Sequence, residues 1–184
     1  MNRFGVLVLL LALMPTLPAQ NIGNSEVQVG DFRFPLPPGW TRVDRDNKNL
    51  LVPANAVASP STYIQFNGFD LGSNDLQAGF NAGWRGFAQG HKVVSNGPVV
   101  SRRSPGGFDY LYTTGTTTEG GKQWDVAFAG AQYGKRLETV LFVSSDPDAQ
   151  TRKAYLKQFQ SFLDSIRFGP SDASTASLAR NRRP

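Results

Sequence analysis

The sequence predicts an α+β domain in which an antiparallel β-sheet is flanked by helices. Most of the 184-residue chain consists of short runs of alternating apolar residues, separated by turn signals such as Asn96–Gly97. Two segments, 73–90 and 145–168, change instead to the period of an amphipathic helix. Consecutive strands joined by short turns are antiparallel, and helices set apart from such strands are typical of an α+β fold.

The first part of the chain predicts short strands. EVQVGDFRF (26–34) indicates two strands around a tight turn at Gly30–Asp31. WTRV (40–43) and LLVP (50–53) indicate two more, joined by a polar turn. STYIQFNGFDL (61–71) predicts a longer strand, because it is rich in β-branched and aromatic residues.

The stretch FRFPLPPGWTRV (32–43) contains a PxxP match between Pro35 and Pro38, so it has two interpretations. It is either a displayed recognition peptide or a corner of the fold. Prolines end a strand without leaving unpaired N–H groups, and Gly39 permits a sharp turn that directs Trp40 toward the core. The flanking aromatic residues favour the corner.

Residues 73–90 predict a helix with an unusual glycine content. Ser73 or Asn74 is expected as its N-cap, with Asp75 in the first turn. Three glycines weaken the helix, which predicts that it packs very closely against a neighbouring element. The glycines are Gly79, Gly83 and Gly86, and the apolar stripe is Leu76, Phe80, Trp84 and Phe87.

The second half predicts a β-meander. The runs 91–95 and 98–103 flank the turn Asn96–Gly97, and the runs 108–118 and 122–133 flank Glu119–Gly121. A further strand starts at residue 136. In strand 122–133, Trp124, Val126 and Phe128 share one face, and Asp125, Ala127 and Ala129 share the other. Both faces are largely apolar, which predicts a sheet covered on both sides, with a closely packed helix over the alanines.

The final helix is predicted to begin near residue 145. Ser145 or Asp146 is expected as its cap, Pro147 at the first helical position and Asp148 in the first turn. Gly169–Pro170 ends it. The apolar stripe consists of Tyr155, Phe159, Phe162 and Ile166.

Residues 1–19 are expected to be a secretory signal peptide, since Arg3 precedes an apolar run and Ala19 fits the cleavage site. That run is shorter than the roughly 20 residues that span a bilayer. Residues 20–168 are expected to form a single domain and 169–184 a disordered, basic tail. The prediction is an exported soluble protein, periplasmic or secreted, without a transmembrane segment in its mature chain.

The composition excludes several kinds of function. The chain has no cysteine, which excludes thiol catalysis, iron–sulfur clusters and thiolate zinc sites. Its net charge is +5, but residues 20–168 carry 15 Lys and Arg against 13 Asp and Glu. Nucleic-acid binding requires a clustered basic face on the protein, so we expect no nucleic-acid partner.

Few residues indicate catalysis. His91 is the one histidine, and no G-x-S-x-G motif supplies a serine to it. A transition-metal centre needs two or more such ligands, so neither a metal nor a cofactor is expected. The carboxylates Asp109 and Asp125, with Trp124 beside the second, are candidates for a glycan hydrolase and are possible cross-strand neighbours. The other interpretation places both at exposed or strand-edge positions.

Aromatic residues supply the candidates for a binding surface. Tyr110, Tyr112 and Trp124, together with Asp109 and Asp125, are the binding candidates, because Tyr and Trp form interaction hot spots. At alternating strand positions such aromatic residues are more often part of a core, which is the favoured interpretation.

The two ends of the domain resemble a known family. The opening F-x-F-P-x-P-P-G-W is similar to the start of PsbP-like domains, and the closing helix resembles the end of that group. The resemblance covers about residues 26–168. It implies a Mog/PsbP-like α/β/α sandwich with a non-catalytic, partner-binding role, here in an exported bacterial member. The closing residues are Phe159, Phe162, Leu163, Ser165, Ile166 and Phe168.

Three functions follow as hypotheses. The first is an exported, non-catalytic binding or accessory module of the cell envelope with a protein partner, which predicts an exposed apolar groove. The second is a carboxylate-based hydrolase, which needs two carboxyl groups about 5–9.5 Å apart in a cleft. The third is a carrier of a small apolar ligand, which needs an enclosed pocket between the sheet and the glycine-rich helix.

Overall fold

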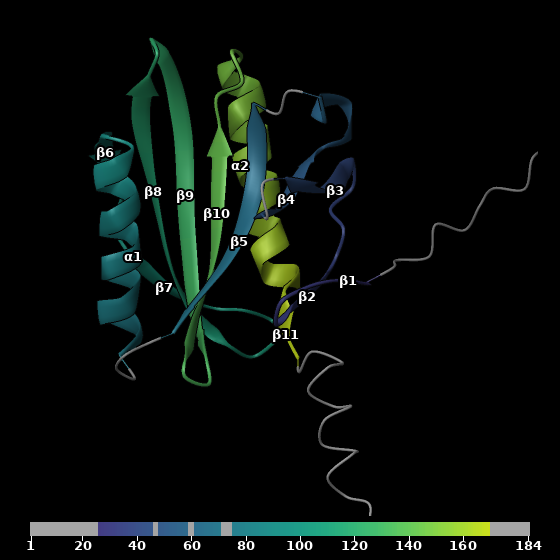
Figure 1. Cartoon of the computed structure of the whole chain (residues 1–184), viewed down its shortest axis with the longest axis vertical. Coiled ribbons are helices and arrows are strands. Elements are labelled where there is room, and N and C mark those ends of the chain that lie inside the picture. The colour runs from purple at the N-terminus through teal and green to yellow at the C-terminus, as the bar shows by residue number, and fades with distance from the viewer. Residues whose placement is uncertain (1–25, 46–47, 59–60, 71–74, 170–184) are drawn as a thin grey trace, which may run out of the picture.

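The computed structural model describes residues 26–45, 48–58, 61–70 and 75–169 (Figure 1). The expected signal peptide and residues 170–184 of the expected tail lie outside this part of the chain. The strands are β1 (Glu26–Val29), β2 (Phe32–Pro35), β3 (Trp40–Arg45), β4 (Lys48–Pro53), β5 (Thr62–Asp70), β6 (Val93–Asn96), β7 (Val100–Arg103), β8 (Asp109–Glu119), β9 (Lys122–Tyr133), β10 (Arg136–Ser144) and β11 (Arg167–Phe168). The helices are α1 (Leu76–Gly90), α2 (Ala149–Ser165) and a 3-10 turn at Ala54–Ala56.

The strands form two sheets, and every pairing in them is antiparallel. The main sheet has the order β3-β4-β5-β10-β9-β8-β6, with β7 also paired to β8. The smaller sheet has the order β1-β2-β11, so β11 at the end of the domain pairs with the hairpin formed by β1 and β2. The predicted α+β class, an antiparallel sheet with helices, is confirmed.

The two helices lie on opposite faces of the main sheet (Figure 1). The helix α2 packs on the alanine face, where Phe159 lies 5.2 Å from Phe142 between ring centroids. The helix α1 packs on the other face, where Phe80 lies 5.1 Å from Phe128. The prediction of a sheet covered on both sides is confirmed, and the helix over the alanines is α2.

The predicted hairpin around Asn96–Gly97 is wrong. Both β6 and β7 pair with β8, where Asn96 lies opposite Gly115 and Val100 opposite Tyr112. They are successive parts of one interrupted edge strand. Gly97 does not adopt the positive φ that a two-residue hairpin turn requires. Its N–H instead donates to the carbonyl of Thr114 at 2.7 Å, so the chain continues along β8.

The predicted helix caps also need correction. In α1 the cap is Asp75, whose carboxylate accepts from the Ala78 N–H at 3.1 Å. Ser73 and Asn74 lie outside the described residues. In α2 the cap is Asp148, which accepts from the backbone of Gln150 and Thr151, so neither Ser145 nor Asp146 caps it. Each helix thus begins one position after an aspartate that the sequence placed in the first turn. As the N-cap, that aspartate accepts hydrogen bonds from the free backbone N–H groups of the first turn.

The proline stretch is a corner of the fold, as the sequence favours. The strand β2 ends at Pro35, and the Trp40 N–H donates to the carbonyl of Pro37 at 3.0 Å. Gly39 takes a φ of +77°, which turns the chain. Trp40 is 5% exposed and packs edge-on against Tyr155 of α2.

Candidate functional site

The two candidate catalytic carboxylates lie far apart. In the β8–β9 ladder Asp125 is opposite Thr116, and Asp109 lies seven residues further along β8. At about 3.4 Å per residue, roughly 24 Å separates these positions. The prediction that Asp109 and Asp125 are cross-strand neighbours is wrong, because the short turn after Glu119 fixes a register that places them at opposite ends.

Each of these carboxylates is held by a neighbouring arginine. Asp109 is exposed and forms an ion pair with Arg103 at 3.0 Å. Asp125 forms a less exposed pair with Arg152 of α2, at 2.9 Å from Nε. Arg152 also donates to the carbonyl of Asp146 at 2.6 Å. Asp125 therefore attaches the first turn of α2 to the sheet.

Tyr110 and Tyr112 are buried under α2. The Tyr110 hydroxyl donates to Asp164 at 3.4 Å, and the Tyr112 hydroxyl accepts from Gln160 at 3.1 Å. Burial raises the pKa of both phenols, and the charge of Asp164 raises the pKa of Tyr110 further. Both are residues of the core, with polar tips that orient α2.

Trp124 lies on the opposite face of the sheet. It packs against the apolar cluster beneath α1, which contains Phe80 and Phe128. The five candidates therefore do not form one site. They are divided between two faces and both ends of the β8–β9 hairpin.

A first surface groove, of about 640 Å³, lies between the proline corner and α2; we call it the proline groove. The segment Pro35–Pro38 forms one wall. The helix α2 forms the other with Ala154, Lys157, Gln158, Ser161, Phe162 and Ser165.

The walls of the proline groove are fixed in position. Proline restricts φ, and this segment is tied back by the hydrogen bond from Trp40 to Pro37. The Trp40 indole donates to the Gln158 side chain at 2.9 Å and so joins the corner to α2. Phe162, at the base, is buried and packs edge-on against Phe34. The groove is thus a preformed, mainly apolar surface beside one cation, Lys157.

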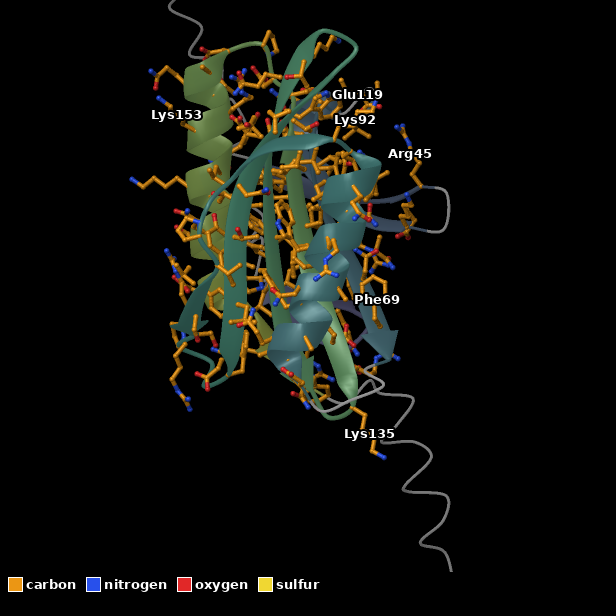
Figure 2. All side chains as sticks on the ribbon, turned by 90° about the vertical axis from the view of Figure 1, so that its left-hand side faces the viewer. Arg45, Phe69, Lys92, Glu119, Lys135 and Lys153 are labelled. Atoms are coloured by element: carbon orange, nitrogen blue, oxygen red, sulfur yellow. The ribbon has the colours of Figure 1, made fainter. Side chains whose placement is uncertain are left out.

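A second surface groove, of about 450 Å³, lies between α1 and the strands β4 and β5; we call it the α1 groove. The helix contributes Ala82, Gly83, Gly86 and Phe87. Phe69 of β5, which is 49% exposed, lies beside α1 in the view that has this helix in front (Figure 2).

The strand side of the α1 groove carries several polar side chains beside the apolar Phe128 and Leu141. Gln65 donates to the Asn67 side chain at 2.7 Å, and Lys48 and Tyr63 also line the groove. Burial raises the pKa of the Tyr63 phenol, with a smaller effect from Glu119, so Tyr63 remains a neutral hydroxyl. The groove occupies the place expected for a carrier's pocket, but it is a surface groove rather than an enclosed cavity.

The carrier hypothesis placed a pocket between the sheet and the glycine-rich helix, where the α1 groove lies, but the sequence did not identify the proline groove as a site. The signal for the α1 groove was Gly86, a helical glycine whose position no neighbouring atom explains. The signal for the proline groove was the PxxP stretch, which is a wall of the groove rather than a ligand.

Two searches of the described residues bear on other functions. They contain no group of three or more His, Asp or Glu side chains placed to hold a metal ion. Within the same ranges, no helix is long and apolar enough to cross a membrane.

Comparison with known proteins finds similar solved structures but no similar sequence. No protein-family model and no curated protein matches the sequence. The cyanobacterial PsbP (CyanoP) of Synechocystis sp. PCC 6803 is similar in structure, with a TM-score of 0.55 and 11% identity over 85% of this chain and 100% of its own. LpqN, involved in cell envelope biogenesis of Mycobacterium tuberculosis, has a TM-score of 0.55 and 16% identity over 79% of this chain and 90% of its own.

A third solved structure has the same architecture. The Ran-binding protein Mog1p of Saccharomyces cerevisiae has a TM-score of 0.56 and 10% identity over 79% of this chain and 95% of its own. At such identities the likeness shows the fold and not the activity.

Proposed function

We propose that this protein, which has the PsbP-like fold, is an exported, non-catalytic binding module of the cell envelope whose partner protein docks in the proline groove. The observation that carries the proposal is the groove itself: a preformed apolar surface between the corner Pro35–Pro38 and α2. A rigid surface loses little conformational entropy when a partner binds, which favours affinity.

The lining of the proline groove defines the chemistry of the partner. Fully burying one large apolar side chain contributes about 1.5–3 kcal/mol, and Pro37, Ala154 and Phe162 offer apolar contact. Lys157 provides a cation at the same surface. The partner segment would therefore present an apolar anchor residue next to a carboxylate.

The assignment to the cell envelope rests on the predicted signal peptide 1–19 and on analogy. LpqN, one protein with this fold, is described as involved in cell envelope biogenesis, and Mog1p as binding Ran. Those properties belong to those proteins. The description of Mog1p supports a partner-binding role for the fold, that of LpqN supports the envelope, and the predicted signal peptide supports export.

The hydrolase hypothesis has less support than the binding module. Its two carboxylates would have to converge within about 5–9.5 Å, whereas Asp109 and Asp125 are roughly 24 Å apart along the ladder. Both are already engaged by arginines, Arg103 and Arg152.

Site-specific photo-crosslinking in the native host tests the proposal. A photoreactive amino acid replaces Ser161, an exposed residue of the groove, or Lys153, an exposed residue of α2 outside it (Figure 2). We expect a discrete protein adduct from position 161 in the envelope fraction and none from position 153. Blocking the groove with Ala154→Arg should remove the adduct.

Two outcomes would contradict the proposal. One is the absence of any adduct at position 161 in a folded protein. The other is an equal adduct pattern at positions 153 and 161, which would indicate non-specific contact.

A further inference from the structure

We propose that the α1 groove is a second binding site, which takes a single-chain amphiphile with an anionic head: a carboxylate or a phosphate on an acyl or alkyl chain. The site lies on the α1 face of the sheet, whereas the proline groove lies beside α2 on the other. Its volume of about 450 Å³ falls within the range of small-molecule sites, roughly 300–1,000 Å³.

Glycines of α1 leave space for the chain of the ligand. A Cβ at Gly83 would lie 3.2 Å from Phe128, so this glycine permits close packing of the helix on the sheet. A Cβ at Gly86 would meet nothing within 4 Å. Glycine weakens a helix relative to alanine, and at Gly86 no internal contact requires it. The space beside Gly86 opens into the groove.

Aromatic rings lie on both sides of the groove, with Phe87 of α1 on one side and Phe69 of β5 on the other. Along α1, the Trp84 ring stacks on Phe87 at 5.7 Å, and Phe87 lies 4.5 Å from His91. Across the groove, Phe69 is half exposed on β5. An apolar chain lying between Phe87 and Phe69 would bury surface on both sides.

Cations at the β3–β4 hairpin define the head group. Lys48 is the charged side chain among the described residues that line the groove, and Arg45 lies directly opposite it in the ladder. Like charges at directly opposite positions repel each other, and an anion between them removes that repulsion. In the described part of this hairpin the carboxylate of Asp44 contacts Arg42, and Asp46 in the turn lies outside the described residues.

The amides of Gln65 and Asn67 on the strand side add donors for the same head. Gln65 donates to the oxygen of Asn67, which fixes the orientation of that amide. The group that Asn67 then presents to a ligand is its NH2, a donor. Lys48 and Asn67 together match a carboxylate or phosphate oxygen.

Displacement of a fluorescent fatty acid tests the proposal with the purified mature chain. The probe is dansyl-undecanoic acid, and the competitors are palmitate, hexadecyl phosphate and the neutral hexadecanol. We expect saturable binding that the two anionic amphiphiles reverse, with hexadecanol at least about tenfold weaker because it cannot pair with Lys48. The relative strength of palmitate and hexadecyl phosphate distinguishes a free fatty acid from a phosphate-bearing lipid.

Matched variants locate the site. Gly86→Leu fills the groove and should abolish probe binding, whereas Gly90→Leu places the same side chain into open space on the same helix, outside the groove lining. Lys48→Gln should weaken binding about tenfold, and Lys135→Gln, at an exposed turn (Figure 2), should not. If Gly86→Leu does not fold, Phe69→Ser tests the same groove from the exposed rim.

Several results would overturn the proposal. They are the absence of saturable probe binding, equal binding by the Gly86→Leu and Gly90→Leu variants, and displacement by hexadecanol as strong as by palmitate. None of these results depends on the crosslinking outcome for the wild-type proline groove.

Discussion

The indole Nε1 of Trp40 donates a hydrogen bond to Oε1 of Gln158 at 2.9 Å, across a sequence separation of 118 residues. This contact joins the end of the proline corner to the middle of α2. It therefore holds together the two walls of the proline groove. The hydrogen bond is partly buried, so its effect on the stability of the protein can be measured.

Removing this hydrogen bond should lower the free energy of unfolding, and the two residues should show a measurable interaction free energy. In a double-mutant cycle of Trp40→Phe and Gln158→Ala, we expect an interaction free energy of about 1 kcal/mol. Urea denaturation of the four proteins provides the measurement. Additive single-mutant effects would show that the two residues do not stabilise each other.

The two aspartate–arginine pairs should differ sharply in their effect on stability. Asp125→Asn weakens the ion pair with Arg152, in which the Asp125 side chain is 21% exposed and the Arg152 side chain 11%. We expect a loss of about 2 kcal/mol in the free energy of unfolding. Asp109→Asn alters an exposed pair with Arg103, and we expect about 0–1 kcal/mol. Chemical denaturation compares them; similar losses would contradict the structural role given to Asp125.

Alkaline pH should destabilise the fold through its buried tyrosines. Burial raises the pKa of Tyr63, Tyr110 and Tyr112 above 10.0. The native state then keeps protons that the unfolded chain releases, so this stabilisation is present below pH 10 and is lost as the pH rises through the raised native values. We expect the melting temperature to fall above about pH 10. In the Tyr112→Phe variant that decline should be shallower, and an unchanged slope would contradict the assignment.

Export is a separate prediction from the sequence. Expression of the full chain in a Gram-negative host should release a periplasmic protein whose first residue is Gln20, because Ala19 fits the cleavage position. Mass spectrometry of the periplasmic fraction measures this. Leu9→Arg interrupts the apolar run and should retain the precursor in the cytoplasm. A mature chain that still starts at Met1 in the periplasm would contradict the signal peptide.

The fold could be predicted largely from periodicity, since each strand and helix repeats its apolar residues at its own spacing. The alternation of Trp124 and Asp125 correctly assigned the two faces of β9. Register and edge pairing were not predictable in the same way. Whether β6 pairs with β7 or with β8 depends on the backbone conformation at Gly97, which the residue type leaves open.

The candidate sites were predicted less well, for a physical reason. Tyr110 and Tyr112 have the composition of a hot spot, but burial by α2 makes them core, and burial depends on the tertiary arrangement. The grooves are formed by segments distant in sequence, such as Pro37 and Ser161, or Phe69 and Gly86. No local pattern shows that such pairs will face each other.

Two glycine-to-alanine substitutions should change stability in opposite directions. A Cβ at Gly130 of β9 would lie 2.9 Å from the buried ring of Phe80, so Gly130→Ala should destabilise by about 1–3 kcal/mol through overpacking. A Cβ at Gly86 meets no atom within 4 Å, and alanine favours a helix, so Gly86→Ala should stabilise by up to about 1 kcal/mol. Thermal and urea unfolding measure both. Because stability alone would select alanine at position 86, a stabilised Gly86→Ala variant with weaker probe binding would show that this glycine serves the groove. Destabilisation by Gly86→Ala would instead mean that the glycine serves the packing of α1.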